Sequence, residues 1–308
     1  MKNDFILLFA TQTEKNVPET LTGANVVETV DGVTVGEYDG VFVTRNPDGV
    51  VATPGEEINT KPHQSLSTKI DMAGCGSDAN AVVFGPILEA CGFVRTVDST
   101  PGAEKEIFTL DNTVDSPILT LGRHVGNKKY NVIPDARGNV DFSFDAFISM
   151  SLSFMGGYVR PVEAPFPETL IYENYADPIP VNCENTVLAQ LDGEDLVLHN
   201  LSIKAGSGVN MVNVPGQKEA RHSPLFATGS VTILAADISD KDWFEVVESH
   251  NGVVHVPFEV QHGTTQYNTI NFKSLGVQLS KPTESFIDGD AAYQFEMAFQ
   301  ESLVITLS

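Results

Sequence analysis

Ile148-Ser-Met-Ser-Leu-Ser-Phe154 decides the fold class, because apolar residues alternate with serine along its whole length. Such alternation places apolar side chains on one face of a β-strand and polar side chains on the other. The same pattern recurs along most of the chain, most clearly at Ser65–Ala73, Phe142–Asp145, Val254–Gln261 and Tyr293–Phe299. The sequence therefore predicts a mainly β protein with half-buried antiparallel strands, arranged as a sandwich or a barrel.

Two stretches break this pattern and predict short α-helices. Phe84–Gly92 has proline near its start and glycine at its end, the usual asymmetry of helix termini. Ser239–Ser249 places Ser and Asp residues ahead of an apolar stripe that contains the only tryptophan, Trp243, so we expect a capped helix with its indole in the core. The proline-rich segment 160–181 lacks donors for a strand ladder and predicts a linker or an extended arm.

The two halves of the chain repeat one order of predicted elements. Each begins with a strand that is followed by a long polar loop rich in Gly, Pro and Asn. A second strand, a short helix and at least three further strands come next. The first strands are expected at 41–44 and 197–203, the loops at 45–64 and 204–228, and the second strands at 66–73 and 230–236.

The closing strands of the two halves match best. Asp145 and Asp290, each followed by Ala, open alternating runs that end in Phe154 and Phe299. Any two β-rich stretches look alike when only their predicted strands are compared. A helix at the same position in each half nevertheless favours a tandem duplication. We therefore expect a first β domain at 1–159, a proline-rich linker or arm at 160–185, and a second β domain at 186–308.

The composition indicates a globular protein that does not hold nucleic acid. Of its 308 residues 42% are hydrophobic, which is enough for a packed core. The 18 basic and 41 acidic residues give a net charge of −23, whereas proteins that grip nucleic acid neutralise phosphates with Lys and Arg. Phe5–Ala10 is too short for a signal peptide and no apolar run reaches the ~18 residues of a membrane span, so we expect a soluble protein without an export signal.

No residue pattern in the sequence indicates catalysis, a cofactor or a bound metal. The cysteines, Cys75, Cys91 and Cys183, are odd in number and too far apart for a zinc cluster. Cys91 lies near the C-terminal end of a predicted helix, where the helix dipole raises the pKa of a thiol, so we expect a core thiol. No histidine pair has the helical metal-binding spacing, and no phosphate loop or nucleophile motif is present. We therefore expect no enzyme activity.

Two neighbouring segments carry a resemblance to a known family. Lys69-Ile-Asp-Met-Ala-Gly-Cys-Gly-Ser77 is followed by Phe84-Gly-Pro-Ile-Leu-Glu-Ala-Cys-Gly-Phe93. Together they resemble siphophage major tail tube proteins, in which a strand ending in Ala-Gly-Ser-Gly leads to an aromatic-Gly-Pro-Leu-Leu-x-Ala-Cys-Gly helix. Cys75 and Phe84 depart from the more usual Ser and Trp or Tyr, and neither departure touches any chemistry. The likeness continues through Ala136–Val140, Leu152–Tyr158 and Pro180–Asn182 and, more weakly, through Gly229–Ile233, the Asp-Trp-Phe helix and Gln278–Ser280.

The resemblance implies a structural virion protein, the tail tube subunit of a phage assembled in the bacterial cytoplasm. Such subunits are antiparallel β folds that form rings, and their inner sheets close into a barrel through which DNA is ejected. The implied partners are further copies of the chain, tail terminator and tail-tip proteins, and a tape measure protein in the lumen during assembly. DNA is implied only as transient, non-adhering cargo. The expected duplication goes beyond the resemblance and favours three chains per ring, with pseudo-six-fold symmetry, over a hexamer.

The resemblance also implies that long loops reach toward the neighbouring ring. The polar loops at 45–64 and 204–228 are longer than a compact monomer normally carries, so we expect them to make these contacts. The candidate contact residues are Arg45, Asn46, Pro47, Asp48, Glu56, Glu57, Lys61, Lys204, Asn210, Asn213, Gln217, Lys218 and Arg221.

Two rival functions stay open at this point. A minor tail, baseplate or adhesin subunit predicts the same composition but no stacking into uniform tubes. A carbohydrate-active β-sandwich enzyme needs two carboxylates brought together across a cleft, which the many acidic pairs in this sequence do not exclude. It also predicts exposed aromatic residues in a cleft, whereas the single tryptophan is expected in the core.

Overall fold

The computed structural model describes residues 5–45, 55–74, 83–100, 102–172, 176–206, 208–235, 237–250, 252–287 and 289–308. Within these ranges the chain consists mostly of antiparallel strands with two short α-helices, which confirms the predicted mainly β class. In this part of the chain no helix combines the length and the apolar character that crossing a membrane requires.

The strands and helices follow one another closely along the chain. The first half contains β1 (Phe5–Gln12), η1 (Gly23–Asn25), β2 (Val26–Val27), β3 (Val30–Asp39), β4 (Phe42–Arg45), β5 (Glu56–Asn59), β6 (His63–Asp71), α1 (Gly85–Ala90), β7 (Phe93–Asp98), β8 (Lys105–Leu110), β9 (Ile118–Val125), β10 (Lys129–Phe144) and β11 (Ile148–Gly157). The second half contains β12 (Thr186–Leu191), β13 (Glu194–Asp195), β14 (Leu198–Ala205), β15 (Val209–Val214), β16 (Gln217–His222), β17 (Ala227–Leu234), α2 (Trp243–Val247), β18 (Val256–Thr265), β19 (Asn268–Leu279), β20 (Thr283–Ile287), β21 (Asp290–Phe299) and β22 (Val304–Leu307).

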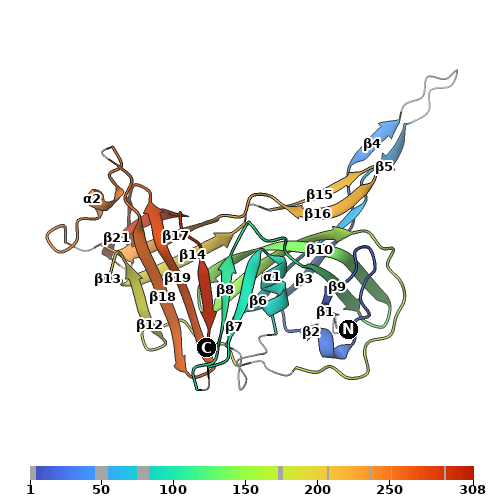
Figure 1. Ribbon diagram of the computed structural model, residues 1–308, viewed down its shortest axis with the longest axis horizontal. Coiled ribbons are helices and arrows are strands. Elements are labelled where there is room, and N and C mark those ends of the chain that lie inside the picture. Colours follow the sequence, from blue (N-terminus) through green and yellow to red (C-terminus); the bar gives the residue numbers. More distant parts are fainter. Residues whose placement is uncertain are drawn as a thin grey trace.

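One long sheet crosses both halves in the order β3-β6-β11-β10-β14-β17-β21-β20. Its first four strands belong to the first half and its last four to the second half. The two groups join where Val140–Ser143 of β10 pair with Ser202–Ala205 of β14. In the elongated molecule of Figure 1, the first-half strands β1, β3 and β9 lie at the right, and the second-half strands β17, β18 and β21 lie at the left.

A second group of strands shares one core with the long sheet. It runs in the order β7-β8-β22-β19-β18-β12-β13, so that the C-terminal strand β22 pairs with β8 of the first half. Phe142 and Phe144 of β10 pack edge-on against Phe272 of β19, with ring centroids 5.2 Å apart in both pairs. The two halves therefore share one hydrophobic core. The predicted boundary at 160–185 separates the two halves along the sequence, but it does not separate two independently packed domains.

The strand pairings of the second half repeat those of the first half. In the first half, neighbouring strands pair in the order β2-β1-β9-β10-β11-β6-β3. The second half has the corresponding order β13-β12-β18-β19/β20-β21-β17-β14, in which β19 and β20 together take the place of the single long strand β10. Even the bulges correspond, since Pro134 and Asp135 of β10 face one residue of β9, while Leu275 and Gly276 of β19 face one residue of β18. Strands β7, β8 and β22 lie outside this repeat.

This pairing corrects one part of the sequence-based alignment. The sequence matched the strand at 41–44 with the strand at 197–203, but the pairings match β3 with β14. The first expectation was wrong because 42–45 belongs to a hairpin that is inserted after β3.

Both helices form where the sequence predicts them, although they are shorter. α1 ends before Gly92, whose φ of +99° is the left-handed conformation that glycine adopts most readily. The side chain of Asp242 accepts hydrogen bonds from the amides of Phe244 and Glu245 and so caps α2. Trp243 is buried, as expected, with its ring 5.7 Å from that of Phe295. Cys91 is also buried, which raises the pKa of its thiol.

The described residues of the proline-rich segment at 160–185 form an extended strap along the body. Val162 pairs with Tyr130, and the amide of Val181 donates to the carbonyl of Ala146 over 2.9 Å. Near the end of the strap, His262 Nε2 donates to the carbonyl of Ile179 over 3.1 Å. The segment is extended, as its prolines indicated, and these contacts hold it against its own chain.

Candidate functional site

The long sheet has one apolar face in the core and one polar face that is rich in small hydroxyl side chains. Alternation along each strand and the register between strands place the polar side chains on the same face. Strands of the first half contribute Thr34, Ser67, Lys69, Asp71, Asn139, Asp141, Ser143, Ser149, Ser151 and Ser153. Strands of the second half contribute Ser202, Lys204, Thr228, Ser230, Thr232, Gln294 and Glu296. We call this surface the polar face.

A row of serines runs across the middle of the polar face. Ser149, Ser143, Ser202 and Ser230 lie opposite one another on four successive strands. The hydroxyls of Ser143 and Ser149 are 2.9 Å apart, and those of Ser202 and Ser230 are 3.0 Å apart, so both pairs are hydrogen-bonded. Ser149 is buried and the other three serines are half-buried, so the hydroxyls of this row make their hydrogen bonds within the sheet.

The polar face carries few charges, and its cations stand next to carboxylates. Lys204 pairs in register with Asp141, and Lys69 precedes Asp71. Burial raises the pKa of both Asp71 and Asp141, and the neighbouring lysines partly oppose this shift. A hollow of about 380 Å³ opens on the first-half part of this face, between Thr34, Ser67 and Ser151. The face therefore has no excess of positive charge for binding phosphates.

Two β-hairpins project from the long sheet, and we call them the arms. The first arm is β4–β5, inserted between β3 and β6, and the second arm is β15–β16, inserted between β14 and β17. In Figure 1 both arms extend toward the same side of the molecule. They occupy equivalent places in the two halves of the repeat.

The arms correct the expectation of irregular loops at 45–64 and 204–228. Residues 209–222 form a regular hairpin in which Val214 pairs with Gln217 across the turn Pro215-Gly216. Pro-Gly is a strong turn signal, and the alternation of Val209, Met211 and the intervening polar residues was masked by the high polar content. In the first segment, β5 and the start of β6 are also strands.

The arms bring together most, but not all, of the candidate contact residues. Arg45 pairs with Glu56 in the first arm, where Glu57 also lies, whereas Lys61 lies in the connection to β6. Lys204 belongs to the polar face. Asn46, Pro47 and Asp48 lie outside the described residues. The second arm holds Asn210, Asn213, Gln217, Lys218 and Arg221.

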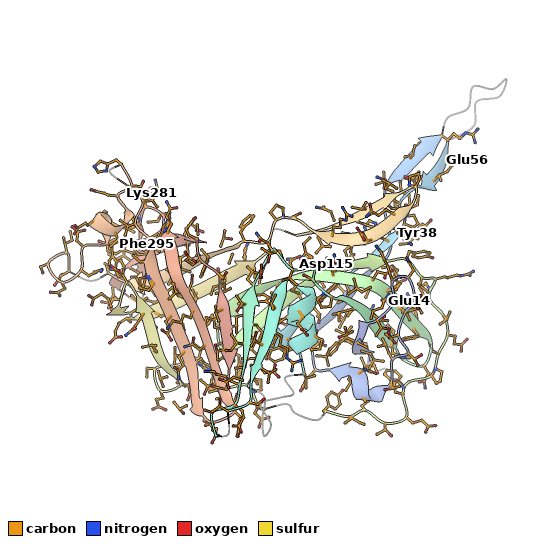
Figure 2. The ribbon with its side chains drawn as sticks, in the orientation of Figure 1. Glu14, Tyr38, Glu56, Asp115, Lys281 and Phe295 are labelled. Carbon is orange, nitrogen blue, oxygen red and sulfur yellow. The ribbon has the colours of Figure 1, made fainter. Side chains whose placement is uncertain are left out.

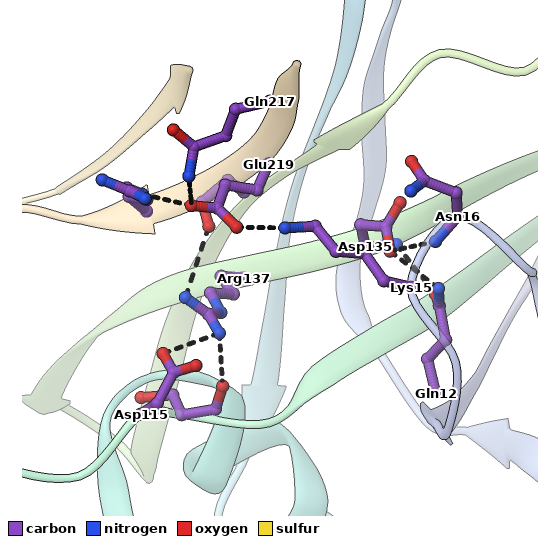
Figure 3. A network of polar contacts seen from close by, with 11 residues as sticks. Gln12, Lys15, Asn16, Asp115, Asp135, Arg137, Gln217 and Glu219 are labelled. Carbon is purple, nitrogen blue, oxygen red and sulfur yellow. Dashed lines mark hydrogen bonds and ion pairs between the residues drawn. The ribbon is translucent and has the colours of Figure 1, made fainter. Parts of the chain in front are cut away.

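The second arm is fastened over β10 and β11 by a polar network (Figure 3). Glu219 of β16 pairs with Lys15, which follows β1, and also with Arg221. Arg137 of β10 donates to the arm carbonyl of Ala220 over 3.5 Å and pairs with Asp115 at 2.8 Å. The hydrogen bonds from Lys15 and Arg221 lower the pKa of Glu219 from 4.5 to about 2.

A second set of hydrogen bonds holds the segment that carries Lys15 against β10. Asp135 at the bulge of β10 accepts hydrogen bonds from the side chain of Gln12 and the amide of Asn16, each over 2.8 Å. Gln12 and Asn16 flank the segment that carries Lys15, as Figure 3 shows. The sequence offered no signal for this cluster, because the segment from Gln12 to Asn16 lies more than a hundred residues from Asp135 and Glu219.

Among the described residues no ion pair fastens the first arm to the body, although Phe42 packs edge-on against Tyr38, whose ring packs against Tyr158. Every residue of β4 is exposed, and only Asn59 of β5 is half-buried, whereas Ala220 of the second arm is buried. Apolar side chains are exposed on and beside the first arm, at Tyr38, Val41, Phe42, Val43 and Ile58. Tyr38 and Glu56 are labelled in Figure 2 at the base and on the outer part of this projection.

The long sheet ends in two strands with a free edge each. Among the described residues, β3 pairs only with β6, and β20 pairs only with β21. Their equivalents in the repeat are not free, because β14 corresponds to β3 and pairs with β10. Free edges promote association between chains unless something covers them.

Comparison with known proteins does not indicate a function, so the function has to be inferred from the arrangement of the sheet and its arms. No model of a known protein family matches this chain, and no curated protein matches it at a significant level.

Proposed function

We propose that this protein is the tail tube subunit of a siphophage-like phage and that its copies join head to tail into rings. One observation carries the proposal. The strands β3 and β20 at the two ends of the long sheet are the equivalents of β14 and the C-terminal part of β10, which pair with each other inside the chain. The edge of one copy therefore matches the opposite edge of the next, and head-to-tail contacts that close give a ring.

Ring closure gives the polar face a function. If the sheets continue from copy to copy with this face inward, the lumen is lined by serine and threonine hydroxyls with no excess of cations. Duplex DNA and the tape measure protein then pass without being held. The net charge of the chain on its own would favour an acidic lumen, whereas the polar face supports a weakly charged, hydroxyl-rich one.

The duplication favours three chains per ring. Each chain contributes eight strands to the long sheet, so three chains supply 3 × 8 = 24 strands. At about 4.8 Å per strand this gives a circumference of about 115 Å, and so a barrel about 37 Å across before strand tilt widens it. Three chains thus enclose an open channel with pseudo-six-fold symmetry. The tube would bind tail terminator and tail-tip proteins at its ends as part of the virion.

Electron microscopy and native mass spectrometry of purified protein test this proposal. We expect rings or stacked tubes, with a mass of three chains per ring. Six chains per ring would contradict the role of the repeat while keeping the tube. Dispersed monomers at high concentration would contradict the tube itself and favour another virion or surface β protein, such as a minor tail, baseplate or adhesin subunit.

A further inference from the structure

We call the strands of each half that take part in the repeat a unit, so the first unit runs from β1 to β11 and the second from β12 to β21. The contact between the two halves of the chain is therefore an example of one unit joined to the next. β14 of the second unit pairs with β10 of the first unit. The second arm, which follows β14, then lies back over β10 and β11. Arg137 and Lys15 of the first unit fasten it through Ala220 and Glu219. At this junction, an arm docks on the closing strands of the unit that precedes it.

The first arm occupies the same place in its unit, and the described residues contain no preceding unit on which it rests. Val43 and Ile58, which pair across this arm, are 49% and 45% exposed, and Phe42 is 48% exposed. An isolated two-stranded hairpin is marginally stable in water, and exposed apolar clusters mark interaction sites. Apart from the contact of Phe42 with Tyr38, the first arm thus has the composition of a docked element that finds no docking surface among the described residues.

The matching docking surface is open at the other end of the molecule. The closing strands of the second unit are β19/β20 and β21, where the side chains of Gln294 and Glu296 are exposed. Leu275 is 72% exposed and lies in the β19 bulge that corresponds to Pro134 and Asp135. In the first unit that bulge supports the segment bearing Lys15, beside which the second arm is fastened.

We propose that the first arm docks sideways on the closing strands of the adjacent copy in the same ring. Val43 and Ile58 then cover Leu275 and the end of β21, as the second arm covers β10 and β11 within the chain. The inference rests on the proposed ring, because it needs β3 of one copy beside β20 of the next. The sequence-based expectation placed this segment in contact with the neighbouring ring. In the proposed arrangement the first arm instead joins adjacent copies within one ring.

Two variants of the exposed side chains test this docking without disturbing the folded chain. The double variant Val43→Ser/Ile58→Ser and the single variant Leu275→Ser each remove apolar area that the interface would bury. We expect each to raise the dissociation constant of the ring by about tenfold or more, which corresponds to about 1.4 kcal/mol, because each removes apolar surface that the interface would bury. Val187→Ser, at a 48% exposed position on β12, is the matched control and should leave the ring unchanged. Circular dichroism confirms folding of each variant.

A disulfide trap then identifies the contact itself. Chains carrying Ile58→Cys are mixed with chains carrying Leu275→Cys, both in a Cys75→Ser/Cys183→Ser background, and are oxidised as rings. We expect a covalent dimer in the mixture and none when either chain is oxidised alone.

The outcomes separate this inference from the proposed function. Variant rings that stay intact and give no covalent dimer, but no longer stack, would place the first arm between rings and overturn the sideways docking. A wild-type protein that forms no ring at all would remove the proposed function together with it.

Discussion

At the scale of single residues, the long sheet separates the two faces by side-chain type. Ser149, Ser151 and Ser153 alternate with Met150, Leu152 and Phe154, and all three apolar side chains are buried. Serine is short enough to bond to the hydroxyl on the next strand, as the pair Ser143–Ser149 does over 2.9 Å. The alternation of the sequence predicts which side chains are buried, but it does not reveal that the serines of four strands form one row.

One ion pair is buried away from the polar face. Glu106 of β8 is fully buried, and it pairs with Arg95 of β7, whose side chain is 22% exposed. A carboxylate in the core is tolerated only while a cation compensates for its lost hydration. Removing the cation is therefore a sharp test of the β7–β8 packing.

Replacing Arg95 by methionine should destabilise the chain by about 3–5 kcal/mol, because it leaves the charge of Glu106 buried and unpaired. The measurement is the urea unfolding midpoint. The double variant Arg95→Met/Glu106→Met should recover most of the loss, since no buried charge then remains. Equal losses in the single and double variants would show that packing, and not charge, determines the effect.

At the scale of elements, bulges decide where strands leave one sheet for another. Directly after the β10 bulge at Pro134–Asp135, pairing with β9 ends at Ala136 and pairing with β11 begins at Arg137, followed by pairing with β14. The β19 bulge at Leu275–Gly276 is its counterpart. A bulge twists its strand and changes the direction of the residues after it, which allows one long strand to serve two sheets. Neither bulge has a sequence signal strong enough to place it in advance.

The fastening of the second arm predicts a local effect of losing one charge. Glu219→Gln should weaken the bonds to Lys15 and Arg221 and raise the hydrogen-exchange rate of the β15–β16 amides about fivefold at pH 7, since a partly exposed charged pair contributes about 1 kcal/mol. Glu57→Gln on the first arm is the matched control and should leave these amides unchanged.

The effect of Glu219 has a defined pH range. Its pKa is lowered from 4.5 to about 2, so its stabilising contribution is fully present above pH 4.5 and is lost as the pH falls through about 2. The difference between the wild type and Glu219→Gln should therefore shrink over this range. A constant difference down to pH 2 would mean that the carboxylate charge is not what fastens the arm.

At the scale of the whole molecule, two buried histidines and one half-buried histidine should make the fold sensitive to mild acid. Burial lowers the pKa of His124, His222 and His262 below 6.5. The unfolded chain thus binds protons before the folded chain does, and stability falls as the pH drops below about 6.5. We expect the urea midpoint to decrease from pH 7.5 to pH 5.5. His262→Gln should reduce this decrease, and an unchanged pH dependence in that variant would assign the effect to the other two histidines.

The charge of the whole molecule predicts that DNA is not retained. With a net charge of −23 and a polar face whose lysines lie beside carboxylates, few cations are available for counterion release. Short duplex DNA should show no salt-sensitive gel shift at physiological salt, with either subunits or assembled tubes. A shift that weakens steeply with salt would contradict a channel through which DNA slides freely.

By itself, the sequence determined the β class, the buried face of each long strand, both helices and the extended proline-rich segment. These depend on local periodicity and on end signals such as Gly92 and Asp242, which act within a few residues. It also indicated a repeat, although it aligned 41–44 with the wrong strand. The tail tube assignment and the inter-ring role of the candidate residues stay proposals.

Only the tertiary structure decided how the two units join. The β10–β14 pairing, the shared core around Phe272 and the Lys15–Glu219 contact unite residues that are far apart in the chain. Strand partners are chosen by packing and by free edges, which no local pattern encodes. For the same reason the two arms, alike in position and in hairpin form, differ in burial: the second covers a neighbouring unit, and the first covers none among the described residues.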